Sequence, residues 1–233
     1  MIRLSFIIHD LSKSAALFFI FHFSFFTVSA QPTLMREVFA SMPDSVLPLV
    51  SKNNRLDCID FIENNMEARV RNVLDEYVVL EALTPDYVRF RTSASSLLEM
   101  KLLPTSDSTS VLCLVQTALT GEADTPRRLE DSNIRFLQPD WTPLPDSNAV
   151  AFTLPPLSDF LAAAAPDSLR ADFEQALRSL DSFHPVRLQL QADTTTLTAT
   201  LQPAYLAVCE RKAVAPFLRS LSFRWNGKRF ELN

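Results

Sequence analysis

The sequence predicts an α+β protein made of two tandem units, each a helix pair followed by an antiparallel sheet. Two observations predict this class. Apolar residues recur every three or four positions before Tyr77 and alternate with polar residues after it. The same change of period returns in the last third of the chain, after a proline-rich stretch. Helices that precede runs of antiparallel strands are typical of α+β proteins.

Residues 1–30 are expected to be a secretory signal peptide. Arg3 and Lys13 precede the apolar run AALFFIFHFSFFTV, which ends in small residues before Gln31, and this order is typical of an export signal. Cleavage near Ala30 would place the mature protein in the periplasm or outside the cell. The run is short for a membrane span of about 20 residues, and the later sequence predicts no transmembrane segment.

The first unit, residues 31–148, begins with two predicted helices. Apolar spacing predicts a helix over 33–42, which Pro43 ends. Asn54 is expected to cap a second helix over 54–67. Its buried stripe is predicted as Leu56, Ile59, Ile62 and Met66, and its outer acidic face as Asp57, Asp60, Glu63 and Glu67. Period two then predicts strands, each with one solvated face, over 77–83, 86–93, 97–104, 110–118 and 133–141.

The second unit, residues 149–233, repeats this order. Helices are predicted over 157–165 and 167–183, and strands over 186–192, 196–203 and 205–211. A hairpin is predicted over 220–232, because the pair Asn226-Gly227 suits a type I′ turn. Aligning the halves pairs Cys113 with Cys209. The alternative to a duplication is that amphipathic strands resemble one another.

Composition excludes several classes of function. Removing Arg3, Lys13 and Asp10 with the signal leaves 20 basic and 26 acidic residues, a net charge of −6, which argues against nucleic-acid binding. The mature chain keeps one histidine, His184, and only Gly121 and Gly227. Histidine-based metal sites need more than one imidazole, and phosphate-binding loops need more glycine. A histidine relay would have to run through His184, which precedes Pro185 at an expected loop position. We therefore predict no catalytic residue, no metal site and no cofactor.

The three cysteines, Cys58, Cys113 and Cys209, share no metal-binding spacing and sit among apolar neighbours. They are expected to be small buried side chains. One disulfide with one free thiol is the alternative.

Candidate partner-binding residues lie in two irregular segments. The predicted loop 120–132 contains Arg127 and Arg128, and the proline-rich segment after it contains Trp141. Binding residues are frequent on long loops, and tryptophan is enriched at interfaces. The alternative for the loop is a solvated segment with local ion pairs. A basic sheet face is a further candidate, formed by Arg89, Arg91, Lys101, Arg187 and Arg224. Pairing of these residues with Glu81 and Glu99 is the alternative.

The stretch MPDSVLPLVSKNNRLDCIDFIENNMEARV, followed by LTPDYVRFRTSASSLLEMKLLP, resembles a family of secreted Bacteroidales proteins classed as a domain of unknown function. The most specific matching residues are Asn53, Asn54, Arg55, Leu56, Asp57, Asp60 and Phe61. The resemblance implies a Gram-negative source and brings no activity or site residue. The tandem layout also resembles that of beta-lactamase-inhibitor proteins, in architecture alone.

These observations favour a secreted protein of the cell envelope that acts as a non-enzymatic binding or accessory module with an envelope protein partner. A hydrolase that uses only carboxylates is one alternative, and it needs two facing carboxylates in a cleft. A carrier of an apolar ligand is another, and it needs an unfilled apolar cavity.

Overall fold

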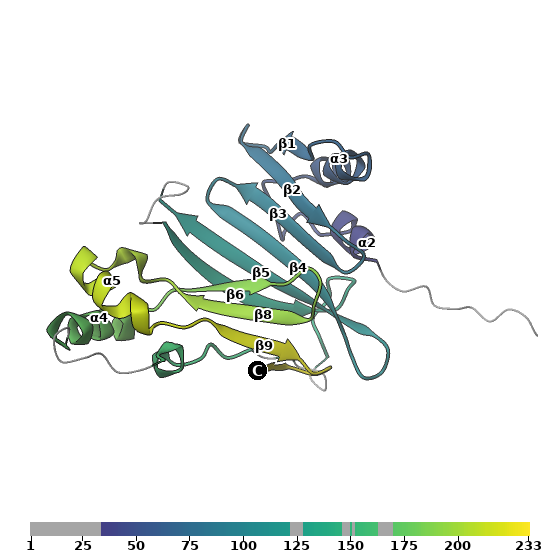
Figure 1. Ribbon diagram of the computed structural model, residues 1–233. Helices are drawn as coiled ribbons and strands as arrows, with labels where there is room; N and C mark the ends of the chain where they lie inside the picture. The colour runs from purple at the N-terminus through teal and green to yellow at the C-terminus, as the bar shows by residue number, and fades with distance from the viewer. Residues whose placement is uncertain (1–33, 122–127, 146–149, 151, 163–169) are drawn as a thin grey trace, which may run out of the picture. The chain divides into compact units, whose positions relative to one another are not determined.

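The computed structural model describes residues 34–121, 128–145, 150, 152–162 and 170–233. The predicted signal peptide, its cleavage site near Ala30 and the predicted boundary at 148/149 lie outside these residues. The chain from Thr33 to Asn233 forms one compact unit. It contains a six-stranded and a four-stranded antiparallel sheet with several helices (Figure 1). The predicted α+β class is therefore confirmed.

The six-stranded sheet is an antiparallel meander in the order β1-β2-β3-β4-β5-β6. Its strands are β1 (Arg69–Arg71), β2 (Tyr77–Leu83), β3 (Tyr87–Ser93), β4 (Ser96–Pro104), β5 (Ser110–Thr120) and β6 (Leu129–Leu137). The period of two located β2 to β5 closely, whereas β1 is too short to show an alternation. Strand β6 begins earlier than predicted, so Glu130 and Asp131 belong to a strand and not to the predicted loop 120–132.

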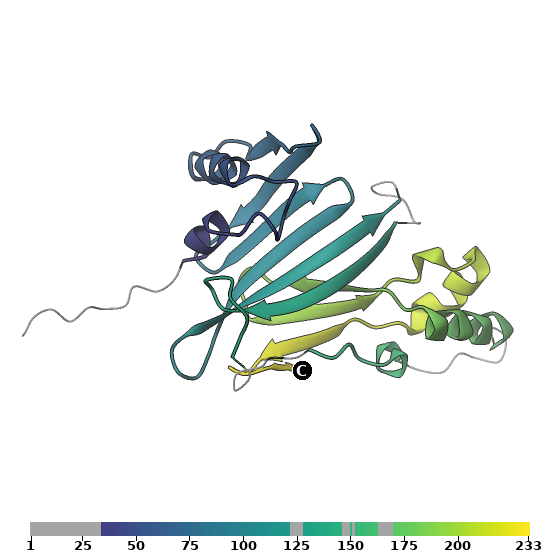
Figure 2. The same ribbon diagram turned by 180° about the vertical axis from the view of Figure 1, so that it is seen from behind.

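Two helices, α2 (Met35–Ala40) and α3 (Lys52–Glu63), cover one face of this sheet near β1 to β3 (Figures 1 and 2). Met35, Val38 and Phe39 of α2 are buried, and the rings of Phe39 and Phe90 of β3 meet edge to face at 5.2 Å. Burial of apolar surface between the helices and the sheet stabilises this layer.

The start and the buried face of α3 differ from the prediction. The helix is capped by Ser51, whose hydroxyl accepts from the Asn54 amide, while the Asn54 side chain accepts from the Ser51 amide. This reciprocal capping box lets the helix begin earlier than Asn54. Leu56 and Met66, predicted to be buried, are exposed, and Arg55 is fully buried. The predicted outer acidic residues are exposed.

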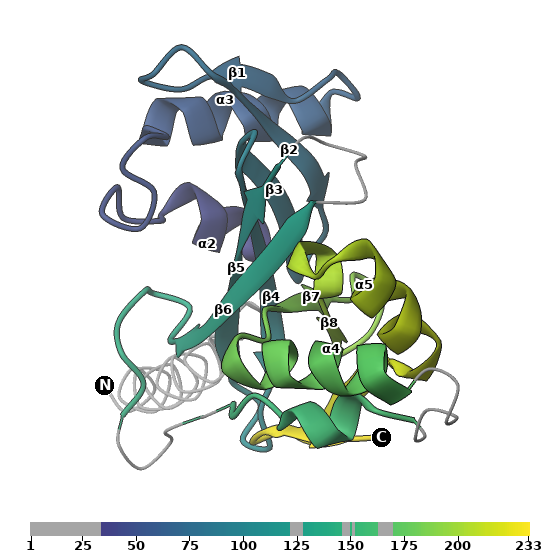
Figure 3. The ribbon, with the colours of Figure 1, turned by 90° about the vertical axis from the view of Figure 1, so that its left-hand side faces the viewer.

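The second sheet has the order β10-β9-β8-β7, with β7 (Val186–Leu190), β8 (Thr196–Leu201), β9 (Leu221–Trp225) and β10 (Phe230–Leu232). It lies with α4 (Arg170–Ser182) and α5 (Val208–Val214) on the side of the six-stranded sheet away from α2 and α3 (Figure 3). Its apolar face shares a core cluster with Tyr87, Leu103, Cys113 and Val115 of the large sheet.

Two predicted elements of the second half are wrong. Residues 205–211 were expected to form a strand, but most of them belong to α5. Glu210 accepts from the Ala207 amide at the start of this helix, and Glu210, Arg211 and Lys212 are good helix formers. In 157–162, the described part of the predicted helix 157–165, the chain forms a 3-10 turn, η2 (Leu157–Phe160), and Leu161 then pairs with Leu218 as an isolated bridge. The predicted end of this helix at Ala165 and the predicted start of the next helix at Asp167 lie outside the described residues.

The predicted hairpin at the end of the chain is confirmed, although its turn differs. Trp225 pairs with Phe230, and the Asn226 amide donates to the Arg229 carbonyl, which closes a four-residue loop. Gly227 has a φ of 96°, whereas Asn226 does not have a positive φ. A type I′ turn needs positive φ at both central residues, so the prediction of that turn type is wrong.

Strands β4 and β5 are buried on both faces, which corrects the expectation of one solvated face. The cause is the second sheet, whose edge strand β7 is held by side chains of β6. Asp131 accepts from the Val186 amide at 3.1 Å, and Ser132 accepts from the Leu188 amide at 3.0 Å. Backbone amides on the edge of β7 thus donate to side chains of β6 instead of to another strand, and these bonds join the two sheets.

Candidate partner-binding groove

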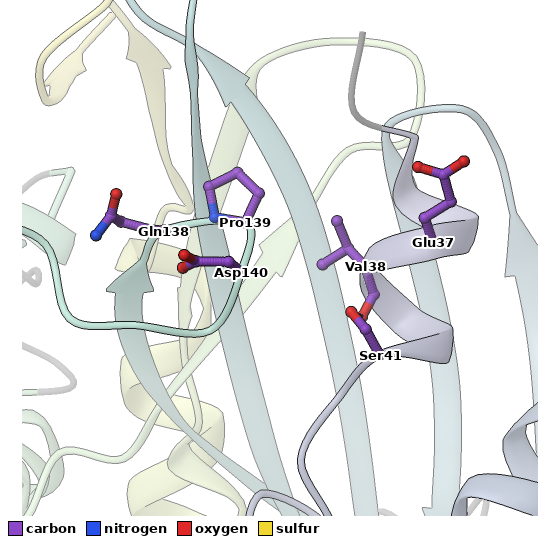
Figure 4. A pocket seen from close by; sticks show the side chains of 6 residues that line it. All are labelled: Glu37, Val38, Ser41, Gln138, Pro139 and Asp140. Carbon is purple, nitrogen blue, oxygen red and sulfur yellow. The ribbon is translucent and has the colours of Figure 1, made fainter. Parts of the chain in front are cut away.

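A surface groove lies between α2 and the turn that follows β6 (Figure 4). Its volume is about 400 Å³, and its lining residues are Glu37, Val38 and Ser41 from α2 and Gln138, Pro139 and Asp140 from the turn. The turn belongs to the proline-rich segment that the sequence indicated as a candidate for partner binding. Two segments separated by about one hundred residues in the chain therefore form the walls of one groove.

Hydrogen bonds fix the shape of the turn. The Trp141 amide donates to the Gln138 carbonyl at 2.9 Å, and the Gln138 amide donates to the Thr142 carbonyl at 2.9 Å. The Asp140 carboxylate accepts from the Thr142 amide and hydroxyl. These bonds hold the pKa of Asp140 below its usual range. Asp140 is therefore a fixed negative charge at neutral pH.

Trp141 anchors the turn to α2 and carries backbone strain. Its φ is 72°, in the left-handed region that a bulky residue rarely adopts. Its indole Nε1 donates to the Val38 carbonyl at 3.0 Å, and its ring packs against the core cluster under α2. A strained conformation costs about 1–3 kcal/mol and persists only where its surroundings hold it. The Trp141 side chain therefore holds the two walls of the groove in place.

The groove offers hydrogen-bond acceptors to solvent. Gln138 donates its amide nitrogen to the Thr142 hydroxyl and the Pro143 carbonyl, which leaves its side-chain oxygen to accept. The Glu37 carboxylate is exposed and has no ion-pair partner among residues 34–121, 128–145 and 170–233. Amides, hydroxyls and cationic groups of a partner would match such a surface.

Of the three predicted partner-binding residues, Arg128 and Trp141 do not come together. Arg127 lies outside the described residues. Arg128 is partly buried and faces Glu130 at 3.4 Å, and Glu130 also pairs with Arg187. Trp141 lies beyond the other end of β6, and the nine residues of that strand span about 30 Å at about 3.3 Å per residue. Trp141 alone adjoins the groove.

The predicted basic sheet face is largely neutralised by internal ion pairs. Arg89 contacts Glu81 at 2.7 Å and Glu99 at 3.1 Å, and Arg91 contacts Glu81 at 2.7 Å. Lys101 is 2% exposed and contacts Asp86 at 2.8 Å. Arg187 pairs with Glu130. Most of these basic groups therefore join strands and sheets, as the alternative interpretation of the sequence expected, and only Arg224 stands apart.

Neither the acidic residues of α3 nor the buried Glu99 resemble a catalytic pair of carboxylates. On α3, Asp57 and Asp60 are exposed to solvent, and Glu63 pairs with Arg36 at the surface. Glu99 has no exposed side-chain surface and accepts from the Tyr87 hydroxyl at 2.7 Å. Burial raises the pKa of Glu99 above its usual range. A carboxyl group without access to solvent cannot meet a dissolved substrate.

The three cysteines are all free thiols. Burial raises the pKa of Cys58 to about 12 and also raises that of Cys113, so neither forms a thiolate at neutral pH. Cys209 is exposed on α5, which corrects the expectation that it is buried. Its predicted equivalence to Cys113 is also wrong, because Cys113 lies on the buried strand β5.

Comparisons with known proteins give a family model and a solved structure that are similar to this chain. A family model described as "Protein of unknown function (DUF3256)" matches residues 27–230. The solved structure of a domain of an uncharacterized protein from Porphyromonas gingivalis W83 is similar, with 25% sequence identity and a TM-score of 0.66. That similarity covers 85% of this chain and 96% of the other. No curated protein matches. The predicted resemblance to a Bacteroidales family of unknown function is confirmed.

Proposed function

Because the chain belongs to the DUF3256 family of unknown function, we propose from its own geometry that it is a non-enzymatic binding or accessory module of the cell envelope. The observation that carries this proposal is the groove between α2 and the Gln138–Trp141 turn. Strain at Trp141 is maintained there by a hydrogen bond between two distant segments. Strained backbone of this kind clusters at functional sites.

The proposed location is the periplasm or the outside of the cell, after cleavage near Ala30. The support is the order of charged, apolar and small residues in the first thirty positions. In the part of the chain that the structure describes, no helix has the length and apolar character needed to cross a membrane. Sequencing the N-terminus of protein from an envelope fraction tests this location. Gln31 is the expected first residue, and an intact Met1 would contradict it.

The exposed acids of α3 and the polar rim of the groove favour a binding role over a carboxylate hydrolase or a carrier of an apolar ligand. A carboxylate hydrolase needs two facing carboxylates about 5–10 Å apart in a cleft, and the acids of α3 instead point to solvent. A carrier needs a largely apolar cavity, whereas the groove is rimmed by Glu37, Ser41 and Asp140. We propose an envelope protein as the partner, since hydrogen-bond acceptors on an open surface suit a polypeptide chain.

Site-specific photo-crosslinking in cells of the source organism tests the groove. A photoreactive residue is placed at Glu37 or Ser41 in the groove and, as the matched control, at Asp181, which is exposed on α4. The expected result is one discrete crosslinked protein from both groove positions and none from Asp181. Crosslinks from all three positions alike, or from Asp181 only, would contradict the proposal.

A charge reversal sharpens this experiment. Glu37→Arg changes the exposed rim of the groove and leaves the buried face of α2 intact. It should abolish the crosslink from Ser41, because the acceptor surface then carries a competing cation. Arg36→Ala, on the neighbouring position, removes only a surface pair with Glu63 and should leave the crosslink unchanged. Equal crosslinking by both variants would show that the groove does not contact the partner.

A further inference from the structure

A second, more polar pocket opens where the two sheets meet. Its volume is about 520 Å³, within the range of about 300–1,000 Å³ that is usual for small-molecule sites. Asp86 and Lys101 line it from the β3–β4 side, and residues 193–196, Arg224 and Asn233 line it from the second sheet. It shares no lining residue with the groove at α2.

One wall of this pocket is electrically neutral and rigid. The Lys101 ammonium donates to the Ala192 carbonyl at 2.6 Å and contacts Asp86 at 2.8 Å. The side chain is 2% exposed, and a buried charge of this kind needs such partners. Lys101 therefore holds the turn between β7 and β8 against β4. Because its charge is balanced by that of Asp86, the two residues together add no net charge to the pocket.

The other wall holds two opposite charges that do not neutralise each other. Arg224 and Asp193 are both exposed and line the same pocket. Neither has an ion pair or side-chain hydrogen bond within residues 34–121, 128–145 and 170–233, and the two are not paired with each other. Arg224 stands directly across the strand register from Thr196, and Asp193 lies three residues before that threonine.

We propose that this pocket binds a small zwitterion that carries one ammonium and one carboxylate group, as free amino acids and short peptides do. The guanidinium of Arg224 is a planar donor that matches a carboxylate. The carboxylate of Asp193 receives the ammonium group, and the hydroxyl groups of Thr194 to Thr196 supply further hydrogen bonds. Lys101 and Asp86 balance each other, and the side chains of Arg224 and Asp193 add one charge of each sign, so the pocket favours a ligand whose own charges balance.

Isothermal titration of the mature protein with three probes tests the charge pattern. Diglycine carries both charges, N-acetyldiglycine lacks the ammonium, and diglycine amide lacks the carboxylate. Diglycine should bind most tightly, and each blocked probe should bind about tenfold more weakly, because a hydrogen bond to a charged group is worth about 1.5–3 kcal/mol. Absence of saturable binding, or equal binding of all three probes, would overturn the proposal.

Two variants assign each charge to its residue. Arg224→Gln should bind diglycine and diglycine amide equally, and Asp193→Asn should bind diglycine and N-acetyldiglycine equally. Arg229→Gln is the matched control, since Arg229 is exposed on the same hairpin and pairs with Glu231 outside the pocket. Thermal unfolding confirms that each variant is folded. If Arg224→Gln still prefers diglycine to its amide, as the Arg229→Gln control should, the assignment is refuted.

Discussion

The Arg55 side chain holds α3 to the loop before it. Replacement of Arg55 by methionine should remove these contacts and lower the free energy of unfolding. Arg55 is fully buried, although it was not part of the predicted buried stripe of the helix. Its guanidinium donates to the Val50 carbonyl at 2.8 Å and to the Met42 carbonyl, and it contacts Asp44 at 3.1 Å. Arg55→Met keeps an unbranched side chain and removes every donor.

The size of the effect follows from these contacts. Each buried carbonyl left without its donor costs about 1–3 kcal/mol. The carboxylate of Asp44 is 67% exposed, so loss of its ion pair adds at most about 1 kcal/mol. Removal of a buried charge offsets part of this loss, because methionine has no desolvation cost. We expect a net loss of about 3 kcal/mol, which lowers Tm by about 6–12 °C for a domain of this size.

Urea unfolding of the mature protein, followed by circular dichroism, measures this loss. Arg36→Met is the control, since Arg36 makes an exposed ion pair with Glu63 that should be worth at most about 1 kcal/mol. The reasoning is refuted if Arg55→Met unfolds within about 1 kcal/mol of the original protein or no more easily than Arg36→Met. A confirmed loss of stability would give a structural reason for the presence of Arg55 among the residues that carry the resemblance to the family.

Three further predictions concern other parts of the molecule. Burial raises the pKa of Glu99 in the folded state. The contribution of Glu99 to the free energy of unfolding should therefore fall as the pH rises from the carboxyl pKa of the unfolded chain to that of the folded protein. The fall should be about 1.4 kcal/mol per pH unit in this window. Urea unfolding at several pH values should show that Glu99→Gln lacks this pH dependence. If the free energies of unfolding of the variant and of the original protein differ by the same amount at every pH, the prediction is wrong. Trp141→Phe loses the hydrogen bond to the Val38 carbonyl, which should cost about 1 kcal/mol and weaken the crosslink from Ser41; unchanged stability and crosslinking would count against the anchoring role. A thiol reagent should modify Cys209 in the folded protein and the two buried cysteines only after unfolding, and mass spectrometry after brief labelling checks this order.

The local pattern of the sequence located most of the strands and one wall of the groove. Alternation of apolar and polar residues located β2 to β5, since period two is a property of the strand itself. The Asn226-Gly227 pair located the last hairpin. Tryptophan between prolines singled out the turn at Trp141, but α2 as the opposite wall was not predictable, because the two segments are joined by a bond that spans 103 positions.

Tertiary structure alone decided which polar residues are buried. Glu99 and Lys101 occupy the polar positions of an alternating strand, which in an isolated sheet would face solvent. The second sheet covers that face, so these side chains became buried ion pairs. Residues 208–211 belong to the helix α5, although a strand was expected over 205–211. The physical reason is that periodicity shows which face of an element is apolar, whereas the elements that pack against the other face come from distant parts of the chain.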